Sequence, residues 1–255
     1  MLRVATVNVN GLRAAARKGF GAWLADRGAD VVCLQEVRCT AEEVPAGLFD
    51  GWYVAHAECA DRGRCGVAVL TRREPTAVRL GFGSAEFDTS GRYVEVDLPG
   101  LTVGSLYLPS GDVGTPRQDE KFRFMAEFRG YLKEARDREL LVAGDWNIAP
   151  AEPDLRNWKA NLRKSGFLPE ERAWLGELFT EHVDVVRALH PGQDGPYTWW
   201  SYRGRAFDND AGWRIDHHVA TPGLAATATA AVVDRAASYD TRWSDHAAVV
   251  VDYAV

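Results

Sequence analysis

The chain has 255 residues, of which 46% are hydrophobic and 26% charged, as is usual for a globular protein. Its formal net charge of -6 argues against a surface that binds nucleic acid as a whole, so a DNA site would have to be a local positive patch. No apolar stretch approaches the roughly 20 residues that cross a bilayer, and no signal-peptide pattern is visible. We therefore expect one domain over residues 1–255, a cytoplasmic location and no membrane partner.

The first part of the chain predicts a βαβ-like unit followed by hairpins. Residues 3–8 and 30–36 contain apolar runs typical of strands, and residues 12–27 place apolar side chains on one side of a helix. Further strands, separated by Gly, Pro and charged residues, are predicted at 52–57, 65–71, 92–98 and 101–108.

The second part of the chain predicts a long helix followed by a strand, and then further helices and strands. Residues 117–136 carry apolar side chains at steps of three and four, which predicts a surface helix leading into a strand at 139–144. Helices are then predicted at 154–165, 170–179 and 180–189, and strands near 213–219, 228–234 and 247–253. Two strand-rich halves with helices outside favour an α/β fold, a four-layer α/β sandwich of two packed mixed β-sheets flanked by helices.

The cysteines do not predict a metal or disulfide site. Four are present, at positions 33, 39, 59 and 65, and none belongs to a C-x-x-C pair. Cys33 lies inside an apolar run, where cysteine behaves as a small hydrophobic residue. We expect neither structural zinc nor a disulfide.

Five short segments, far apart in the chain, place polar side chains at or near the end of a predicted strand. They contain Asn8 with Asn10, Glu36, Asp145 with Asn147, Asp216, and Asp245 with His246. A side chain just past the C-terminal end of a buried strand lies at the rim of the sheet, where α/β folds place their chemistry. We therefore expect these residues to share one site.

The segments supply what phosphodiester hydrolysis needs: a divalent cation, a positioned water and help for the leaving oxygen. Glu36 could hold a hard cation such as Mg²⁺, with Asp245 and the amide oxygen of Asn8 or Asn10 completing the ligands. For Glu36 alone, the alternative is a salt-bridged carboxylate at a strand end.

Asp145 and Asn147 are two residues apart, a spacing that in an extended chain sends both side chains to the same side. Together they could orient and deprotonate a water. The alternative is an Asp/Asn turn that bonds to its own backbone.

The S-D-H segment adds a histidine to the expected site. Asp216 could set the tautomer and orientation of His246, and the alternative is a structural histidine. The adjacent His217 and His218 do not predict a metal site, because neighbours on a strand point to opposite faces.

With these residues in place, the chain resembles the exonuclease III family of DNA-repair nucleases, within the exonuclease, endonuclease and phosphatase superfamily. The likeness runs nearly end to end. It rests on N-V-N-G-L-R at 8–13, C-L-Q-E at 33–36, Y-L-P-S-G at 107–111, G-D-W-N at 144–147, G-F-L-P-E-E-R at 166–172, G-W-R-I-D at 212–216 and S-D-H at 244–246. Q-E, G-D-x-N and S-D-H are shared across the superfamily, whereas G-F-L-P-E-E-R and the tryptophan-rich tail favour the DNA-repair branch.

The resemblance implies a metal site that binds Mg²⁺, with Mn²⁺ as an alternative cation. Glu36 is similar to the family's main ligand, with Asp245, Asn8 and Asn10 near the ion. Asn10 departs from relatives that carry Asp at its position.

The resemblance also implies the catalytic roles. Asp145 and Asn147 are similar to the pair that orients the water, and Tyr107 to a partner of the phosphate or the leaving group. His246, held by Asp216, is similar to the histidine that contacts phosphate or handles a proton. The group that deprotonates the water stays open between Asp145 and His246.

DNA contacts follow from the same resemblance, because an abasic sugar can be flipped into an apolar pocket. The implied pocket residues are Trp199, Trp213 and Ile215. The implied phosphate contacts are Arg92, Arg117 and Lys121, together with Ser110, which takes a position where several relatives carry Asn or Gln. The alternatives are core packing for the tryptophans, expected for Trp200 and Trp243, and solvated surface charge for the cations.

The activity implied is that of an apurinic/apyrimidinic (AP) endonuclease that cuts 5′ to an abasic sugar, with 3′→5′ exodeoxyribonuclease and 3′-phosphodiesterase activity. The expected partner is double-stranded DNA with abasic sites or blocked 3′ ends, bound by a monomer. Two alternatives stay open: a small-molecule or lipid phosphatase on the same scaffold, which the acidic net charge favours, and a non-catalytic DNA-binding relative.

Overall fold

In the computed structural model, which describes residues 1–61 and 63–255, the strands form two six-stranded sheets. The first sheet has the spatial order β11 (Ala228–Asp234), β12 (Ala248–Tyr253), β1 (Leu2–Asn8), β2 (Val31–Gln35), β4 (Val67–Thr71) and β3 (Tyr53–Ala57). The second has the order β5 (Ala77–Leu80), β6 (Tyr93–Leu98), β7 (Leu101–Tyr107), β8 (Leu140–Asp145), β10 (Asp216–Ala220) and β9 (Val183–Asp184). Both sheets are mixed, because β1 runs parallel to β2 and β7 parallel to β8 while the other described neighbours run antiparallel.

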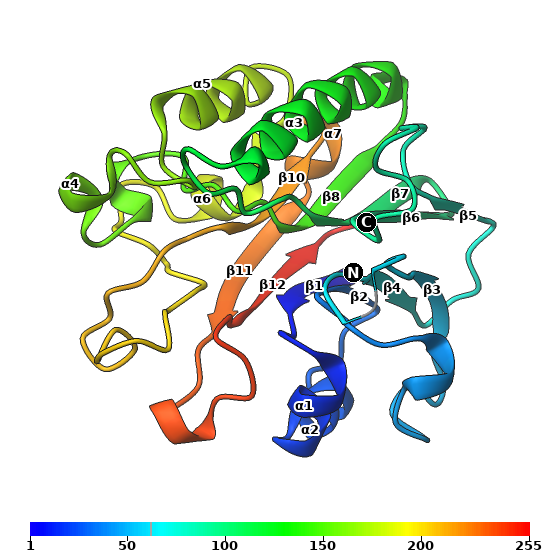
Figure 1. Cartoon of the computed structure of the whole chain (residues 1–255). Helices are drawn as coiled ribbons and strands as arrows, with labels where there is room; N and C mark the ends of the chain where they lie inside the picture. Colours follow the sequence, from blue (N-terminus) through cyan, green and yellow to red (C-terminus); the bar gives the residue numbers. More distant parts are fainter. Residues whose placement is uncertain (62) are drawn as a thin grey trace.

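Helices cover the outer faces of the two sheets (Figure 1). The first sheet is covered by α1 (Leu12–Arg17) and α2 (Phe20–Asp26), and the second by α3 (Pro116–Glu134) and α5 (Pro169–Leu178). The connections contain α4 (Trp158–Asn161), α6 (Val185–Leu189), α7 (Pro222–Ala225) and the 3₁₀ turns Ala41–Glu43, Ala135–Asp137, Glu152–Asp154 and Tyr239–Thr241. The predicted four-layer α/β sandwich is therefore confirmed.

Alternation along the strands builds three layers of core. On β1, Val4 points into the space between the sheets, where it joins Val103 of β7 and Leu141 of β8. Its neighbour Ala5 points the other way, toward Phe20 of α2. Both faces of the central strands are thus buried, which explains why their sequences are nearly continuous apolar runs.

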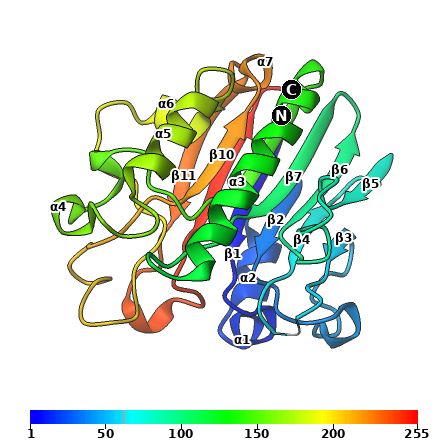
Figure 2. The same ribbon diagram turned by 45° about the horizontal axis from the view of Figure 1, so that its top comes forward.

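The long helix α3 lies lengthwise across the outer face of the second sheet (Figure 2). It starts where the hydroxyl of Thr115 accepts a hydrogen bond from the backbone N–H of Arg117, with Pro116 at the first helical position. Phe124 and Phe128 then pack into the layer between this helix and the sheet. α3 therefore connects the end of β7 to the start of β8 as the crossover of a parallel pair.

Several predicted elements are wrong in extent. The helix expected over 12–27 is two helices, separated where Gly19 takes a left-handed conformation with φ +113°. Only Trp158–Asn161 is α-helical within 154–165, and 180–189 divides into β9 and α6. Within the part of the chain that the structure describes, no helix is both long and apolar enough to traverse a bilayer.

Candidate active site

Strand register brings the polar strand ends to one rim of the molecule. Asn8 at the end of β1 lies beside Gln35 at the end of the parallel strand β2, so Glu36 follows at the same edge. In the second sheet, Tyr107 and Asp145 end the parallel strands β7 and β8 side by side, and Asp216 begins β10 opposite Asp145. Because the two sheets pack face to face, both sets of strand ends border one site.

A buried amide separates two carboxylates of the site. Asn8 is fully buried, and its Nδ2 donates to Glu36 Oε1 at 2.7 Å and to Asp145 Oδ2 at 2.9 Å. The amide oxygen of Asn8 accepts the backbone N–H of Asn10 at 2.9 Å. Asn8 therefore turns its Nδ2 donors toward the two carboxylates, and the role of its oxygen as a cation ligand stays a prediction.

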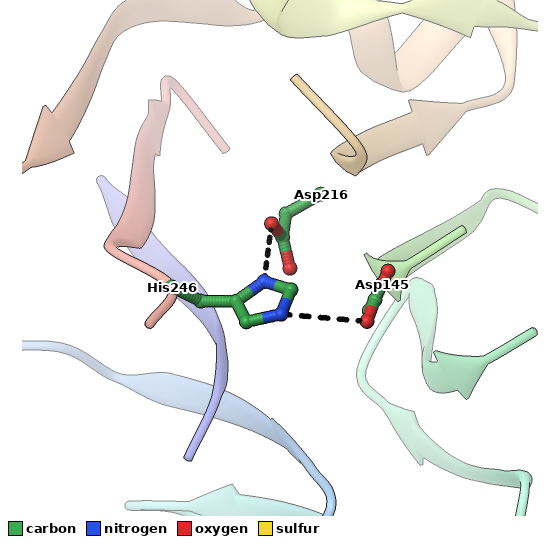
Figure 3. Close-up of side chains that lie close together, drawn as sticks. All are labelled: Asp145, Asp216 and His246. Carbon is green, nitrogen blue, oxygen red and sulfur yellow. Dashed lines mark hydrogen bonds and ion pairs between the residues drawn. The ribbon is translucent and has the colours of Figure 1, made fainter. Parts of the chain in front are cut away.

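The histidine of the S-D-H motif lies between two buried aspartates (Figure 3). His246 Nδ1 is 2.9 Å from Asp216 Oδ2, and its Nε2 is 3.8 Å from Asp145 Oδ2. The hydroxyl of Thr198 also donates to Asp216 Oδ2 at 2.6 Å. The predicted Asp216–His246 pair is present, and the contacts run on without a break from Asp216 through His246, Asp145 and Asn8 to Glu36.

Burial and nearby charges act in opposite directions on the pKa of Asp145 and on the pKa of His246, and the result is a raised pKa for both residues. Burial raises the pKa of Asp145 to about 7, against the attraction of the His246 imidazolium. Burial alone would lower the pKa of His246, but the carboxylates of Asp216 and Asp145 raise it to about 10. The two carboxylates therefore favour the imidazolium form of His246, and the raised pKa of Asp145 suits it to accept a proton near neutral pH.

This arrangement predicts a particular dependence of stability on pH. Since the pKa of folded His246 lies above its ordinary value of 6.5, its stabilising contribution is fully present below about pH 6.5 and is lost as pH rises through about 10. Urea unfolding between about pH 7 and about pH 10.5 should show a loss of a few kcal/mol in the native chain and a smaller loss in His246→Asn. Equal losses in the two proteins would contradict the pairing.

The segment after β8 does not have the extended geometry that the spacing predicted. Asn147 has φ +51°, and its backbone N–H donates to Asp145 Oδ1 at 2.9 Å, so the turn expected as the alternative forms. The side-chain Nδ2 of Asn147 donates to the carbonyl of Leu108 at 2.8 Å. Asn147 is thus held at the rim by its contact with Leu108, just after β7, and it does not share a strand face with Asp145.

Asp245 is held beside this group rather than inside it. Its carboxylate accepts from Asn10 Nδ2 at 2.8 Å and from the indole Nε1 of Trp199 at 3.1 Å. Asp145, Asp216 and His246 are the one described group of three or more acidic, His or Cys ligands whose atoms lie within 4.8 Å of one another. The structure therefore does not bring Asp245 and Glu36 into one close ligand cluster.

Trp199, Trp213 and Ile215 form an apolar wall next to His246. The rings of Trp199 and Trp213 meet edge to face with centroids 6.1 Å apart, and the Trp199 ring is 6.5 Å from His246. Ile215 is 6% exposed and belongs to the same cluster, whereas both tryptophans are half-buried. The three residues predicted to line a sugar pocket are therefore together at the rim, while Trp200 is buried elsewhere, as expected.

On the other side, a groove with a cavity volume of about 670 Å³ borders Tyr107. The predicted contacts Arg92, Ser110 and Arg117 line it, together with other residues that include Arg38, Arg64, Asp61 and Glu120. The Arg92 guanidinium lies 5.1 Å from the centre of the Tyr107 ring. Among the described residues that line this groove, four arginines stand against two acids, which makes it a local positive patch on an acidic chain.

The comparison with known proteins agrees with this geometry. A model described as the endonuclease/exonuclease/phosphatase family matches residues 5–246. The chain belongs to the endonuclease/exonuclease/phosphatase family. An exodeoxyribonuclease from Bacillus subtilis (strain 168) is 34% identical over 251 residues, which are 97% of this chain and 98% of that protein. The predicted relation to exonuclease III proteins is thereby confirmed.

Two solved structures of this family are close in shape. An AP endonuclease from Archaeoglobus fulgidus has a TM-score of 0.91 and 28% identity and covers 100% of both chains. A 3′ phosphatase from Neisseria, bound to a product DNA hairpin, has a TM-score of 0.91 and 28% identity over 99% of both chains. The whole fold, and not only its motifs, is shared with these family members.

One predicted DNA contact is wrong in this family member. Lys121 is fully buried, and its Nζ is 2.8 Å from Glu171 Oε1, which is also fully buried. A buried ammonium that is paired inside the protein has no route to a phosphate on the surface. Lys121 was assigned to the DNA by family resemblance alone, and a resemblance does not tell whether a side chain is buried.

Sequence reasoning missed three polar residues at the site. The guanidinium of Arg38 bonds to Glu36 Oε2, Thr198 bonds to Asp216, and the hydroxyl of Ser244 donates to the carbonyl of Asn8 at 2.7 Å. Arg38 lies two residues after Glu36 of the Q-E motif and Ser244 opens S-D-H, so their proximity in sequence to predicted site residues was the available signal.

The structure also accounts for His217, for which the sequence offered no role. Its Nδ1 is 2.9 Å from the guanidinium of Arg214, and its Nε2 is 2.9 Å from the carbonyl of Ile148. Burial, and then the nearby Arg214 charge, lower the pKa of His217. It is a neutral structural histidine, and His218 points elsewhere, to the hydroxyl of Tyr253.

The donor set of the site fits a divalent cation. Glu36, Asp145 and Asp216 are buried carboxylates, and Asp216 Oδ1 has no hydrogen-bond partner among the described residues. Carboxylate oxygens are the ligands that hard cations prefer.

Proposed function

We propose that this protein is a DNA-repair phosphodiesterase, an AP endonuclease with 3′→5′ exodeoxyribonuclease and 3′-phosphodiesterase activity on double-stranded DNA. The observation that supports it most is the buried Asp145–His246–Asp216 group, set between a wall of two tryptophans and an arginine-lined groove. Relatives named exodeoxyribonuclease and AP endonuclease carry the same fold and support the choice of substrate.

In the proposed reaction, Asp145 removes a proton from the attacking water. Its pKa of about 7 makes it a base that is half ionised near neutral pH, where a general base is most effective. Asn8 and the backbone N–H of Asn147 hold the carboxylate in place. The water oxygen attacks phosphorus, the bond to O3′ breaks, and the leaving O3′ takes a proton from solvent, which leaves a 3′-hydroxyl and a 5′-phosphate on the abasic sugar.

His246 contributes positive charge rather than a base. The Asp216 carboxylate at 2.9 Å keeps the imidazole protonated and oriented, so that it stabilises negative charge on the phosphate oxygens. When bound, Mg²⁺, or Mn²⁺ as an alternative, would be held by Glu36 and would supply further charge neutralisation. Tyr107, beside Asp145 at the strand ends, is placed to meet the phosphate or the leaving oxygen.

The surroundings of the site fit DNA with a missing base. Trp199, Trp213 and Ile215 form an apolar face that can receive a flipped sugar without a base. Arg92 and Arg117 line the groove beside Tyr107, where phosphates of the strand would lie. One domain over residues 1–255, a monomer and a cytoplasmic location remain part of this proposal.

The test is incision of an end-labelled duplex with a single abasic site, with and without a chelator. The native chain should cut the strand 5′ to the site when Mg²⁺ is present, and the chelator should remove activity until metal is restored. Glu36→Gln should need a higher Mg²⁺ concentration for half-maximal rate, because it removes one charged ligand. An exposed carboxylate far from the rim, Asp137, provides the matched control Asp137→Asn.

The same assay separates the alternatives. A phosphatase acting on small molecules or lipids would release phosphate from inositol phosphates and leave the duplex intact. A non-catalytic DNA-binding relative would retain the labelled duplex on a gel without nicking it under any metal. Either result would overturn the proposed function.

A further inference from the structure

A fully buried ion pair lies directly behind the catalytic rim. Lys121 on α3 and Glu171 on α5 are each 0% exposed, and their charged atoms are 2.8 Å apart. Burying two charges is costly unless further hydrogen bonds satisfy them. The partners that they hold therefore indicate what the pair does.

On the lysine side, those partners are parts of the site. Lys121 Nζ donates to the backbone carbonyl of Asn147 at 3.0 Å, and it also contacts the Ser165 hydroxyl at 3.3 Å and the carbonyl of Ser110 at 3.4 Å. Asn147 belongs to the turn that positions the Asp145 carboxylate, and Ser110 lines the positive groove. One ammonium thus connects the catalytic turn with the groove.

On the glutamate side, the partners belong to the G-F-L-P-E-E-R segment. Glu171 accepts the backbone N–H groups of Gly166 at 2.7 Å and Leu168 at 3.0 Å, and the amide of Gln118 at 3.0 Å. Gly166 supports the apolar wall closely, since a Cβ there would come within 3.1 Å of both the Trp213 ring and the Asn147 carbonyl. The carboxylate thus holds the backbone on which Trp213 rests.

We infer that the Lys121–Glu171 pair is a positioning device that sets the catalytic turn, the groove and the tryptophan wall relative to one another. The inference rests on the proposed function for its kinetic consequence, but its structural consequence can be measured without any substrate. It explains why Lys121, a charged residue on α3, is fully buried next to the proposed active site. Lys121 and Glu171 act through Asn147, Ser110 and Gly166 and do not touch the DNA.

The test uses Lys121→Met, which keeps the length of the side chain, and Glu171→Gln, which keeps its shape. The matched control is Glu95→Gln, because Glu95 is also buried and paired, with Arg138 at 2.9 Å next to the start of β8, away from the rim. Amide hydrogen exchange is measured over segments 144–149 and 164–168, and kcat and KM are measured separately on abasic duplex.

Both pair variants should exchange faster in these two segments, and kcat should fall about tenfold to a hundredfold with KM changed little, because a small misplacement of reacting groups mainly slows the chemical step. Glu95→Gln should lower the melting temperature similarly and leave both segments and kcat unchanged. Unchanged exchange in Lys121→Met and Glu171→Gln would overturn the inference, as would an equal loss of kcat in the control. If Lys121→Met does not fold, Glu171→Gln alone gives the same comparison with Glu95→Gln.

If the native chain fails to incise the duplex, the proposed function fails while the exchange comparison still decides the role of the pair. The two ideas therefore have separate outcomes.

Discussion

Replacing Asp145 by asparagine should lower the rate of abasic-site incision by about 10³-fold, because general acid–base groups contribute roughly 10²–10⁴-fold. The substitution keeps the shape of the side chain, so Asn8 and the Asn147 turn can still pack against it. It removes the carboxylate whose pKa of about 7 suits it to accept the proton of the water. Single-turnover rates at saturating DNA measure this step directly.

The stability of Asp145→Asn shows whether a slower incision rate comes from a lost catalytic group or from a damaged fold. Burial raises the pKa of Asp145, which means that its charged form is disfavoured in the folded protein. A neutral amide at this position should therefore leave the melting temperature unchanged or raise it. A variant that is as stable as the native chain and also fully active would remove Asp145 from the proposed reaction.

Replacing His246 by asparagine should lower the incision rate by about 10²- to 10³-fold, since it removes a positioned positive charge from the phosphate site. It should also lower stability, because Asp216 would remain buried with Thr198 as its partner but without the imidazolium. Rapid-quench measurement of incision, together with thermal unfolding, reports both effects.

A matched histidine provides the control for this variant. His190 lies at the end of α6, where its Nε2 meets the carbonyl of Ala231, and it is outside the site. His190→Asn should leave the incision rate within a factor of about two of the native rate. If His246→Asn behaved like His190→Asn, His246 would have only a structural role.

The sequence alone was sufficient to predict which strand ends carry the chemistry. The runs before Asn8, Glu36 and Asp145 are apolar on both faces, so each had to be a central strand with a polar residue at its end. The short edge strand β5 was missed, because its four residues alternate between partial and full exposure and do not form an apolar run. Core elements were thus readable from pattern, and exposed or very short ones were not.

The sequence also predicted that Asp145, Asp216, His246 and Glu36 lie together, and in the structure a continuous series of contacts that passes through Asn8 connects them. Their order along the chain matched the motif order of one family. Residue type and position relative to a strand end were enough for this, because both are local properties of the chain.

Only the tertiary structure decided how the individual polar groups are used. Asn8 faces two carboxylates with its N–H donors, Asn147 takes a left-handed turn, and Lys121 is buried against Glu171 instead of facing DNA. The partners of Asn8 and Lys121, and the carbonyl of Leu108 that the Asn147 side chain contacts, come from distant segments, and the burial that makes these pairings necessary exists only after the layers have packed. Hydrogen-bond direction and burial of charge are properties of the assembled site, whereas the apolar runs that place it are properties of the sequence.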